Sequence, residues 1–307
     1  MFDVPGTEGG GMHGIVRRLE GELAGRYALE RELGHGGMAV VFLARDLRHE
    51  REVAIKVFRS DVGDAMGAER FRREIRLLAR LQHPHILPLY DSGTTGDTSY
   101  FVTPFVDGET LRERLRREGQ LPVNEAVRLA TEVSDALHFA HAHDVIHRDI
   151  KPENILLHDG HAVVADFGIA RAMRRSGAEW TTAAGMAVGS PAYMSPEQAS
   201  GERDVDGRTD IYSLACVLYE MLAGQPPFTG RSAHAIIAQR MTTAPRSVRE
   251  LRATVPEPLD TALARALERA PGDRFPSAGD FSLALAGALF PRRWPAGLRR
   301  LWPFARL

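Results

Sequence analysis

Residues that could transfer a phosphoryl group gather in the stretch 145–168, which contains VIHRDIKPENILL and ends in DFG. Asp149, Asn154 and Asp166 supply hard oxygen atoms that suit Mg²⁺ and can orient a hydroxyl group. Lys151 adds a mobile positive charge where a γ-phosphate would be transferred. Chance would have to place all these polar groups among apolar strands, so we expect them to form a site.

Lysine and asparagine are rare in this chain. Lys56 and Lys151 are the only lysines among 39 basic residues, and asparagine occurs only at Asn124 and Asn154. A compositional bias towards arginine explains these counts without any function. A chain that uses arginine almost everywhere should nevertheless keep lysine where a guanidinium group cannot do the chemistry.

Lys56 ends the apolar run VAI, and a lysine on an apolar strand must bind an anion or expose its ammonium group. Glu74 lies three residues after Phe71 and four before Leu78, within the apolar stripe of a helix predicted over 65–82. A carboxylate on an inward helix face usually has a cationic partner, which predicts an ion pair with Lys56. A glutamate that snorkels from the edge of the stripe is the alternative.

The segment LGHGGMAVV at 33–41 has Gly34 and Gly36, with Ala39 where a third glycine is usual. Glycines let backbone N–H groups approach phosphate oxygens because no Cβ stands in the way. A plain glycine hairpin explains the segment equally well. No helix pattern follows it, which argues against a Rossmann fingerprint or a P-loop.

In their order and spacing, these motifs resemble the eukaryotic-like serine/threonine protein kinases of bacteria, over about residues 27–289. The resemblance implies ATP and Mg²⁺ as cofactors and proteins with serine or threonine acceptors as substrates. Lys56, paired with Glu74, would bridge the α- and β-phosphates, while Asp149 would orient the substrate hydroxyl. Lys151 would neutralise the transferring group, and Asn154 and Asp166 would hold Mg²⁺. A lysine two residues after the catalytic aspartate is similar to the serine/threonine class.

The resemblance also implies a nucleotide pocket. Its candidate residues are Leu33, Gly34, Gly36, Val41, Ala54, Lys56, Thr103, Pro104, Val106, Leu156 and Asp166. Pro104 keeps the backbone carbonyl that the first hinge position offers to adenine, and Val106 would supply the N–H. The small Thr103 at the gatekeeper position predicts a back pocket open to larger inhibitors.

Other positions follow from the resemblance as regulatory or structural. Arg148 would bind a phosphothreonine in the segment 166–197, with Thr181 and Thr182 as candidates and Ser176 less favoured. The stretch 189–197 resembles the substrate-binding end of that segment, and Ser190 stands where the family usually has threonine. We expect His147 to stack beneath Phe167, in a packed column with Leu78 and Leu89. Three further positions would be structural. Glu197 is predicted to form an ion pair with Arg274, and Asp210 would anchor the backbone of the catalytic loop.

The elements that must position these residues indicate a small β lobe followed by a larger helical lobe, which is an α+β, two-lobed architecture, and the resemblance implies that this is the kinase-like fold. Short runs rich in β-branched and apolar residues, separated by glycine or charged turns, indicate five antiparallel strands at 27–34, 39–46, 51–58, 83–93 and 99–106. Helical patterns occupy 111–118, 123–143, 210–224, 257–270 and 277–289. We therefore predict a flexible segment at 1–24, a kinase domain at 25–290 with lobes of about 25–106 and 107–290, and a basic aromatic tail at 291–307.

Composition excludes several classes of protein. With 44% hydrophobic and 26% charged residues, the chain is typical of a soluble globular enzyme, and its net charge of -1 predicts no nucleic acid partner. Cys216 is the only cysteine, which excludes a disulfide framework. The pair His141 and His143 lacks a carboxylate or cysteine partner for a metal site. No apolar run spans a membrane and no signal peptide is evident, which predicts a cytoplasmic location, either alone or as part of a longer membrane protein.

Two questions stay open at this point. The tail carries five arginines, two tryptophans and three prolines, so it is either disordered or lobe-packed, or makes weak contact with a membrane surface. A pseudokinase scaffold that binds nucleotide or partners without turnover is the main functional alternative. A small-molecule phosphotransferase is less consistent with the segment 189–197. The sequence is also compatible with a homodimer.

Overall fold

A computed structural model describes Gly21 and residues 23–36, 39–58, 75–95, 98–167, 191–202 and 204–289. These residues form two compact units. The first contains the described residues up to Thr110, together with 139–148 and 154–167. The second contains 111–138, 149–153 and the described residues from Pro191 onwards. The chain thus passes between units on both sides of the segment 149–153.

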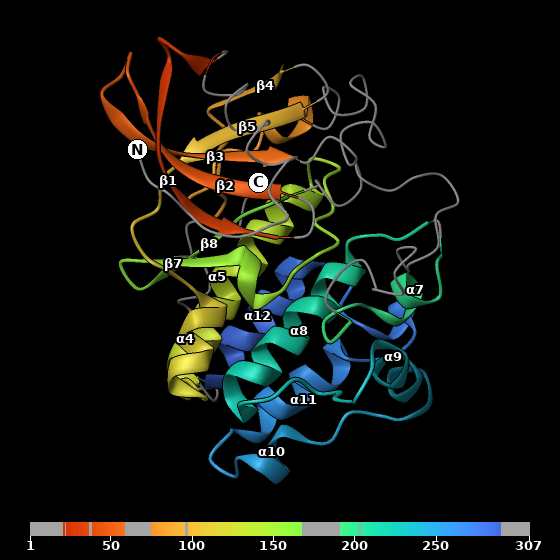
Figure 1. The fold of residues 1–307 in the computed structure, drawn as a ribbon. Coiled ribbons are helices and arrows are strands. Elements are labelled where there is room, and N and C mark those ends of the chain that lie inside the picture. Colours follow the sequence, from red (N-terminus) through yellow and green to blue (C-terminus); the bar gives the residue numbers. More distant parts are fainter. Residues whose placement is uncertain are drawn as a thin grey trace, which may run out of the picture. The chain divides into compact units, whose positions relative to one another are not determined.

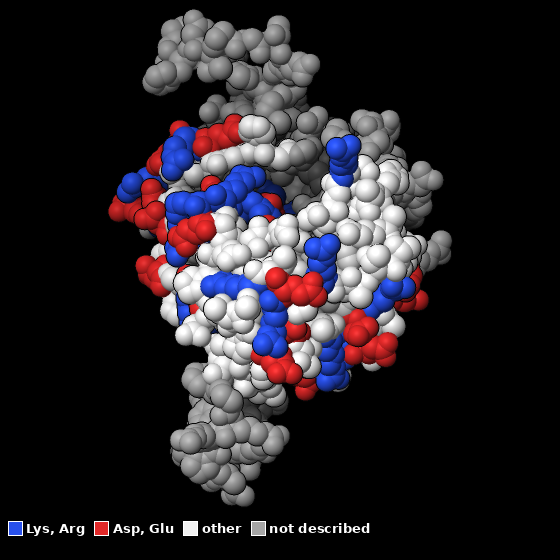
Figure 2. Space-filling model, turned by 90° about the horizontal axis from the view of Figure 1, so that it is seen from below, with Lys and Arg blue, Asp and Glu red and all other residues white. Residues whose placement is uncertain are grey.

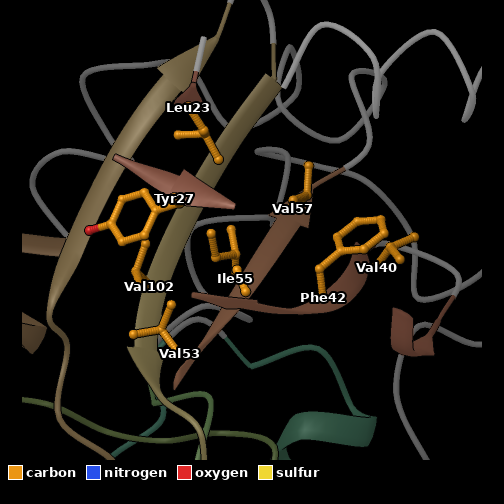
Figure 3. Close-up of a cluster of buried hydrophobic side chains, with 9 residues drawn as sticks. Leu23, Tyr27, Val40, Phe42, Val53, Ile55, Val57 and Val102 are labelled. Carbon is orange, nitrogen blue, oxygen red and sulfur yellow. The ribbon is translucent and has the colours of Figure 1, made fainter. Parts of the chain in front are cut away.

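The first unit is built on a five-stranded antiparallel sheet with strand order β1-β2-β3-β5-β4 (Figure 1). Its strands are β1 (Tyr27–His35), β2 (Ala39–Asp46), β3 (Arg51–Phe58), β4 (Asp91–Thr95) and β5 (Thr98–Pro104). The alternation in REVAIKVF sends Val53, Ile55 and Val57 to one face of the sheet. There they join a buried cluster with Leu23, Tyr27, Val40, Phe42, Ala44 and Val102 (Figure 3).

The opposite face of this sheet is buried at one end and only partly buried further along. Antiparallel partners share a face, and Lys56 lies opposite Val41 on β2 and Phe101 on β5. One end of the face is closed by a second buried cluster of Ala39, Phe58, Ile75 and Phe101, against which Leu78 and Leu89 pack. Further along, Val41, Ala54 and Lys56 are only partly buried. The sheet therefore has one sealed face and one partly open face.

The predicted strand at 83–93 is wrong in extent, because β4 begins only at Asp91. Ahead of it, Ile86 forms a single bridge with Val164. Pro84 and Pro88 lack the N–H that a continuous ladder needs, which explains the interruption. The helix predicted over 65–82 is helical at residues 75–78, and residues 59–74 lie outside the described part.

A small sheet of three strands completes the first unit. It contains β6 (Glu109–Thr110), β7 (Ile155–His158) and β8 (His161–Val164). Gly108 precedes it at a point where a Cβ would lie 2.1 Å from the carbonyl oxygen of Leu157, so only glycine fits there. The tight approach brings the chain that leaves β5 directly against β7.

The second unit is helical. Its elements are α4 (Leu111–Glu118), α5 (Val123–His141, whose last three residues group with the first unit), η1 (Pro152–Asn154, whose last residue does so too), α7 (Pro196–Ala199), α8 (Arg208–Ala223), α9 (Ala233–Thr242), α10 (Val248–Leu251), α11 (Glu257–Ala266), η2 (Pro271–Asp273) and α12 (Ala278–Leu289). Helix α8 packs against α10, α11 and α12 and is buried from Thr209 to Leu222 (Figure 1). It ends where Gly224 adopts φ of 78°. The apolar sequence of α8 predicts this central position.

Charged side chains of both signs intermingle on the face shown in Figure 2. Some ion pairs lie within a helix at i,i+4 spacing, such as Arg114 with Glu118 in α4 and Arg128 with Glu132 in α5. Among the described helices, none combines the length and apolar character that crossing a bilayer requires.

Candidate active site

Lys151 binds Asp149, the residue that the sequence predicts to be catalytic, directly. Lys151 Nζ donates a hydrogen bond of 2.7 Å to Asp149 Oδ2 within the second unit. Their side chains are 20% and 29% exposed, so both remain open to a reactant. The loop is shaped locally by η1, in which Pro152 supplies a fixed φ at the first position. A carboxylate beside an accessible ammonium can orient a hydroxyl group and neutralise an incoming phosphate.

The two predicted metal ligands belong to the first unit. The backbone N–H of Ala165, the residue before Asp166, donates 2.9 Å to the carbonyl oxygen of Asn154. Asp166 has φ of 64°, a left-handed conformation that is uncommon outside glycine. One carboxylate and one carboxamide on adjoining backbone fit a small hard cation such as Mg²⁺. The donor set therefore suits the metal that the sequence implies.

Lys56 pairs with a partner that the sequence did not predict. Its Nζ lies 2.5 Å from Asp166 Oδ2, and the two side chains are 21% and 26% exposed. Glu74, the expected partner, lies outside the described residues. The side chain of Lys56 also lies over the Phe101 ring, with Nζ 6.0 Å from its centroid. Each of the two lysines is thus held against one aspartate.

The candidate nucleotide-pocket residues lie on the partly open face of the sheet and beside it. Ala54 lies opposite both Leu43 and Thr103, which is 7% exposed. Pro104 is the last residue of β5, where its missing N–H is tolerated. Four further candidates, Leu33, Val41, Val106 and Leu156, are half-buried apolar side chains. This half-buried state suits a surface that a flat apolar ring would cover.

Packing against the described residues does not explain Gly34 and Gly36, beside the β1–β2 turn. Counting only the described residues, a Cβ at Gly34 would meet nothing within 4 Å, and one at Gly36 would reach only the Ala39 carbonyl oxygen at 4.0 Å. Neither glycine has a positive φ. A role in ligand approach is one physical reason to keep glycine where the fold tolerates a side chain.

His147 is fully buried, and its Nε2–H donates 2.9 Å to the Ala165 carbonyl oxygen. The predicted contact with Phe167 is present, with ring centroids 4.7 Å apart, but the stacked geometry is wrong because the rings meet edge to face at 62°. Arg148 next to it has φ of 67°. The column that would extend to Leu78 and Leu89 stays a prediction, since those residues are seen packing on the Phe58 cluster.

The predicted pair of Glu197 and Arg274 is present in the second unit. Arg274 donates two hydrogen bonds of 2.7 Å to the two carboxylate oxygens, and both side chains are buried. Asp210 is also fully buried at the start of α8. Thr181, Thr182, Ser176 and Ser190 lie outside the described residues.

Sequence reasoning missed two arginines that contact the segment after Ser190. Arg112 of α4 binds Glu153, Glu220 and Tyr193. Arg240 of α9 is 2% exposed and donates 2.6 Å and 2.9 Å to the carbonyl oxygens of Pro191 and Ala192. No motif marks either position, because both are single arginines in an arginine-rich chain.

The comparisons with known proteins identify the family of the chain. The protein kinase domain family matches residues 27–278, and the chain belongs to this family. More narrowly, it is a domain of the bacterial eukaryotic-like serine/threonine kinase type. The serine/threonine-protein kinase PknB of Mycolicibacterium smegmatis is 43% identical over 264 residues, which are 84% of this chain and 42% of that protein. The probable serine/threonine-protein kinase PknB of Bifidobacterium longum is 41% identical over 268 residues, 84% of this chain and 39% of that protein.

A solved structure supports the fold as well. The kinase domain of Mycobacterium tuberculosis PknI, determined as a double mutant, matches with a TM-score of 0.69 and 31% identity. The match covers 86% of this chain and 96% of that one. This chain spans about two fifths of the length of the curated relatives named above, at 42% and 39%.

Proposed function

We propose that this domain transfers the γ-phosphoryl group of ATP to serine and threonine hydroxyl groups of proteins. The observation that carries the proposal is the double pairing of the two lysines, Lys56 with Asp166 and Lys151 with Asp149. Each pair combines a phosphate-binding cation with a carboxylate suited to metal or hydroxyl binding. The family membership and the names of the relatives support the same chemistry.

Each residue of the proposed site has its own role in the reaction. Lys56 binds the α- and β-phosphates through its compact ammonium group, beside Asp166. Asp149 accepts a hydrogen bond from the substrate hydroxyl and so aligns its oxygen, while Lys151 neutralises charge on the transferring group. Asn154 and Asp166 hold Mg²⁺, which when bound neutralises charge on the phosphate oxygens. Positioning and charge neutralisation account for most of the rate, since the protein forms no covalent bond with the phosphoryl group.

We further propose that Arg148 binds a phosphothreonine made by autophosphorylation at Thr181 or Thr182. A guanidinium group binds a phosphate through two charge-assisted hydrogen bonds, which would order the segment around it. Mass spectrometry of active protein should find phosphate on one of these threonines, and active protein with both unmodified would contradict the proposal.

ATP as the phosphoryl donor supports a cytoplasmic location. The membrane contact of 291–307 and the homodimer stay predictions.

The direct test is transfer of radiolabelled phosphate from ATP to a generic protein substrate in the presence of Mg²⁺. We expect label on serine and threonine after partial hydrolysis of the product. Label that appears only on tyrosine, or binding of ATP with no transfer, would contradict the proposal. The second result would favour the pseudokinase alternative, which no contact among the described residues supports.

A further inference from the structure

A histidine side chain of the first unit is bonded to the backbone beside the candidate adenine site. His158 is the last residue of β7, and its Nδ1–H donates 2.9 Å to the carbonyl oxygen of Asp107. A carbonyl oxygen only accepts, so Nδ1 carries a hydrogen. Asp107 directly follows Val106, whose N–H the sequence assigns to adenine. The bond therefore ties β7 to the chain segment 104–107, which we call the hinge segment.

This bond extends the pairing between β6 and β7. In that pair Glu109 lies opposite Leu157, and Gly108 passes so close that a Cβ there would meet the Leu157 carbonyl oxygen at 2.1 Å. Strand β6 begins at Glu109, so its ladder does not include Asp107. The side chain of His158 makes the attachment there instead. The hinge segment is thus held against β7 at its last residue.

The residue that donates this bond is itself held by a tight hairpin. Strands β7 and β8 are joined by Asp159 and Gly160, which have φ of 50° and 80°. Positive φ at both residues is the pattern of a type I′ turn, whose twist matches that of the strands it joins. His158 and His161 form the pair next to this turn. The position of His158 is therefore set by the fold and needs no nucleotide.

Burial does not account for a histidine at this position, because its side chain is 48% exposed. What the bond restrains is the separation of two half-buried apolar side chains, Val106 and Leu156. Val106 precedes Asp107, and Leu156 lies two residues before His158. A bond between their neighbours limits how far these two side chains can move apart. A binding surface that is already in place costs less to order when a ligand arrives.

We propose that His158 is a positioning residue for the adenine end of ATP. By bonding the Asp107 carbonyl oxygen, it holds the hinge segment at a fixed spacing from Leu156, so that a flat ring fits against both. It acts through the backbone and not by contact with the nucleotide. Its effect is confined to the base, because Lys56, which binds the phosphates, lies on β3. This inference rests on the proposed function, which makes ATP the phosphoryl donor.

Binding of adenosine, ADP and ATP tests the proposal, with displacement of a fluorescent ATP analogue as the measurement. His158→Ala should weaken all three by the same factor, about fivefold, because it removes one hydrogen bond from the wall that they share. His158→Asn should stay within about twofold of wild type, since the amide N–H can replace the imidazole N–H. Unchanged adenosine affinity in His158→Ala would overturn the proposal, as would an equally large loss in His158→Asn.

The matched control is His161→Ala, the same change on the opposite strand of the hairpin. The His161 ring lies beside that of His85, with the ring centroids 6.3 Å apart. This variant should bind adenosine, ADP and ATP as wild type does, and an equal loss of affinity in it would contradict the positioning role. His158→Val serves if the alanine variant does not fold, since a β-branched residue suits a strand.

Steady-state kinetics separates positioning from a general structural role. His158→Ala should raise the KM for ATP about fivefold and leave the KM for a protein substrate unchanged, because only the base loses a wall of fixed position. His158→Asn should restore the KM for ATP. An equal rise in both KM values would show a general structural effect and overturn the proposal.

Adenosine binding requires no phosphoryl transfer, so the outcomes also separate this inference from the proposed function. If the domain transfers no phosphate but His158→Ala loses adenosine affinity, the positioning role stands and the proposed function fails. If wild type transfers phosphate and His158→Ala binds adenosine equally well, the positioning role alone fails. A wild-type domain that binds neither adenosine nor ATP would overturn both.

Discussion

Replacing Glu197 by glutamine should destabilise the second unit far more than the loss of a surface ion pair does. Arg274 is fully buried and donates 2.7 Å to each oxygen of Glu197. Its other N–H groups donate to the carbonyl oxygens of Glu268, Arg269 and Arg208. Glutamine keeps the shape of the side chain but leaves the guanidinium charge without a counter-charge.

The structure sets the size of the effect. Breaking a buried ion pair by neutralising one partner costs about 3–5 kcal/mol, and glutamine should lie near the lower end because its amide oxygen still accepts one hydrogen bond. A loss of about 3 kcal/mol corresponds to a fall in melting temperature of about 6–12 °C for a domain of this size. Changing both partners to methionine should recover part of the loss, because no unpaired charge remains buried.

The control is Arg208→Gln, which breaks the exposed pair with Asp206 but keeps the Arg208 carbonyl oxygen that Arg274 uses. It should cost less than about 1 kcal/mol. Urea unfolding, monitored by far-ultraviolet circular dichroism, gives the free energy of unfolding of each variant. If Glu197→Gln loses no more stability than Arg208→Gln, then the buried pair does not hold the segment that follows Pro191.

Three further predictions concern single side chains. Lys56→Arg should keep the charge yet lower kcat/KM about 100-fold, because a planar fork cannot replace a compact ammonium group beside Asp166; near-normal turnover in a steady-state assay would contradict this. Burial raises the pKa of Tyr27 from its ordinary 10 to about 12, and the negative charge of Asp91 adds to this effect. The tyrosine therefore contributes fully to the free energy of unfolding below pH 10, and this contribution is lost as the pH rises towards 12. Tyr27→Phe should make the alkaline decline in urea unfolding shallower, while Tyr193 and Tyr212, whose pKa burial also raises, keep their own contributions, and an unchanged decline would contradict this. Arg240→Met should raise the KM for a protein substrate about tenfold and leave the KM for ATP unchanged, because the carbonyl oxygens of Pro191 and Ala192 lose a charge-assisted donor. If neither KM changes, this prediction is contradicted.

Local sequence patterns predict most of the strands and helices of the fold. The alternation of REVAIKVF and the stripe of LRERLRRE predict strand 51–58 and helix 111–118, and the structure has β3 and α4 within those bounds. The failure at 83–93 is also local, because an apolar run favours a strand while Pro84 and Pro88 interrupt its ladder. Helices α9 and α10 were not predicted. Their sequences show little apolar periodicity, and in the structure α9 packs against α7 while α10 packs against α8 and α11.

The site was predictable where residue type alone restricts the chemistry. The scarcity of lysine singled out Lys56 and Lys151, and both bind an aspartate in the structure. Partner choice was less accessible, since Asp166 lies 110 residues from Lys56. Arg112 gave no signal, because nothing distinguishes it from the other arginines until the chain brings it to Glu153, 41 residues away, and to Glu220, 108 residues away.

Phosphate transfer by Asp149→Asn tests the central claim most directly. Asp144→Asn is the matched control, because it makes the same chemical change at an exposed position with φ of 61°, a conformation that asparagine tolerates. With ATP, Mg²⁺ and a protein substrate, Asp149→Asn should lower kcat about 10²–10⁴-fold at unchanged ATP binding, while Asp144→Asn should match wild type. Equal incorporation of radiolabel by wild type and Asp149→Asn would contradict the assignment of this loop as the catalytic centre.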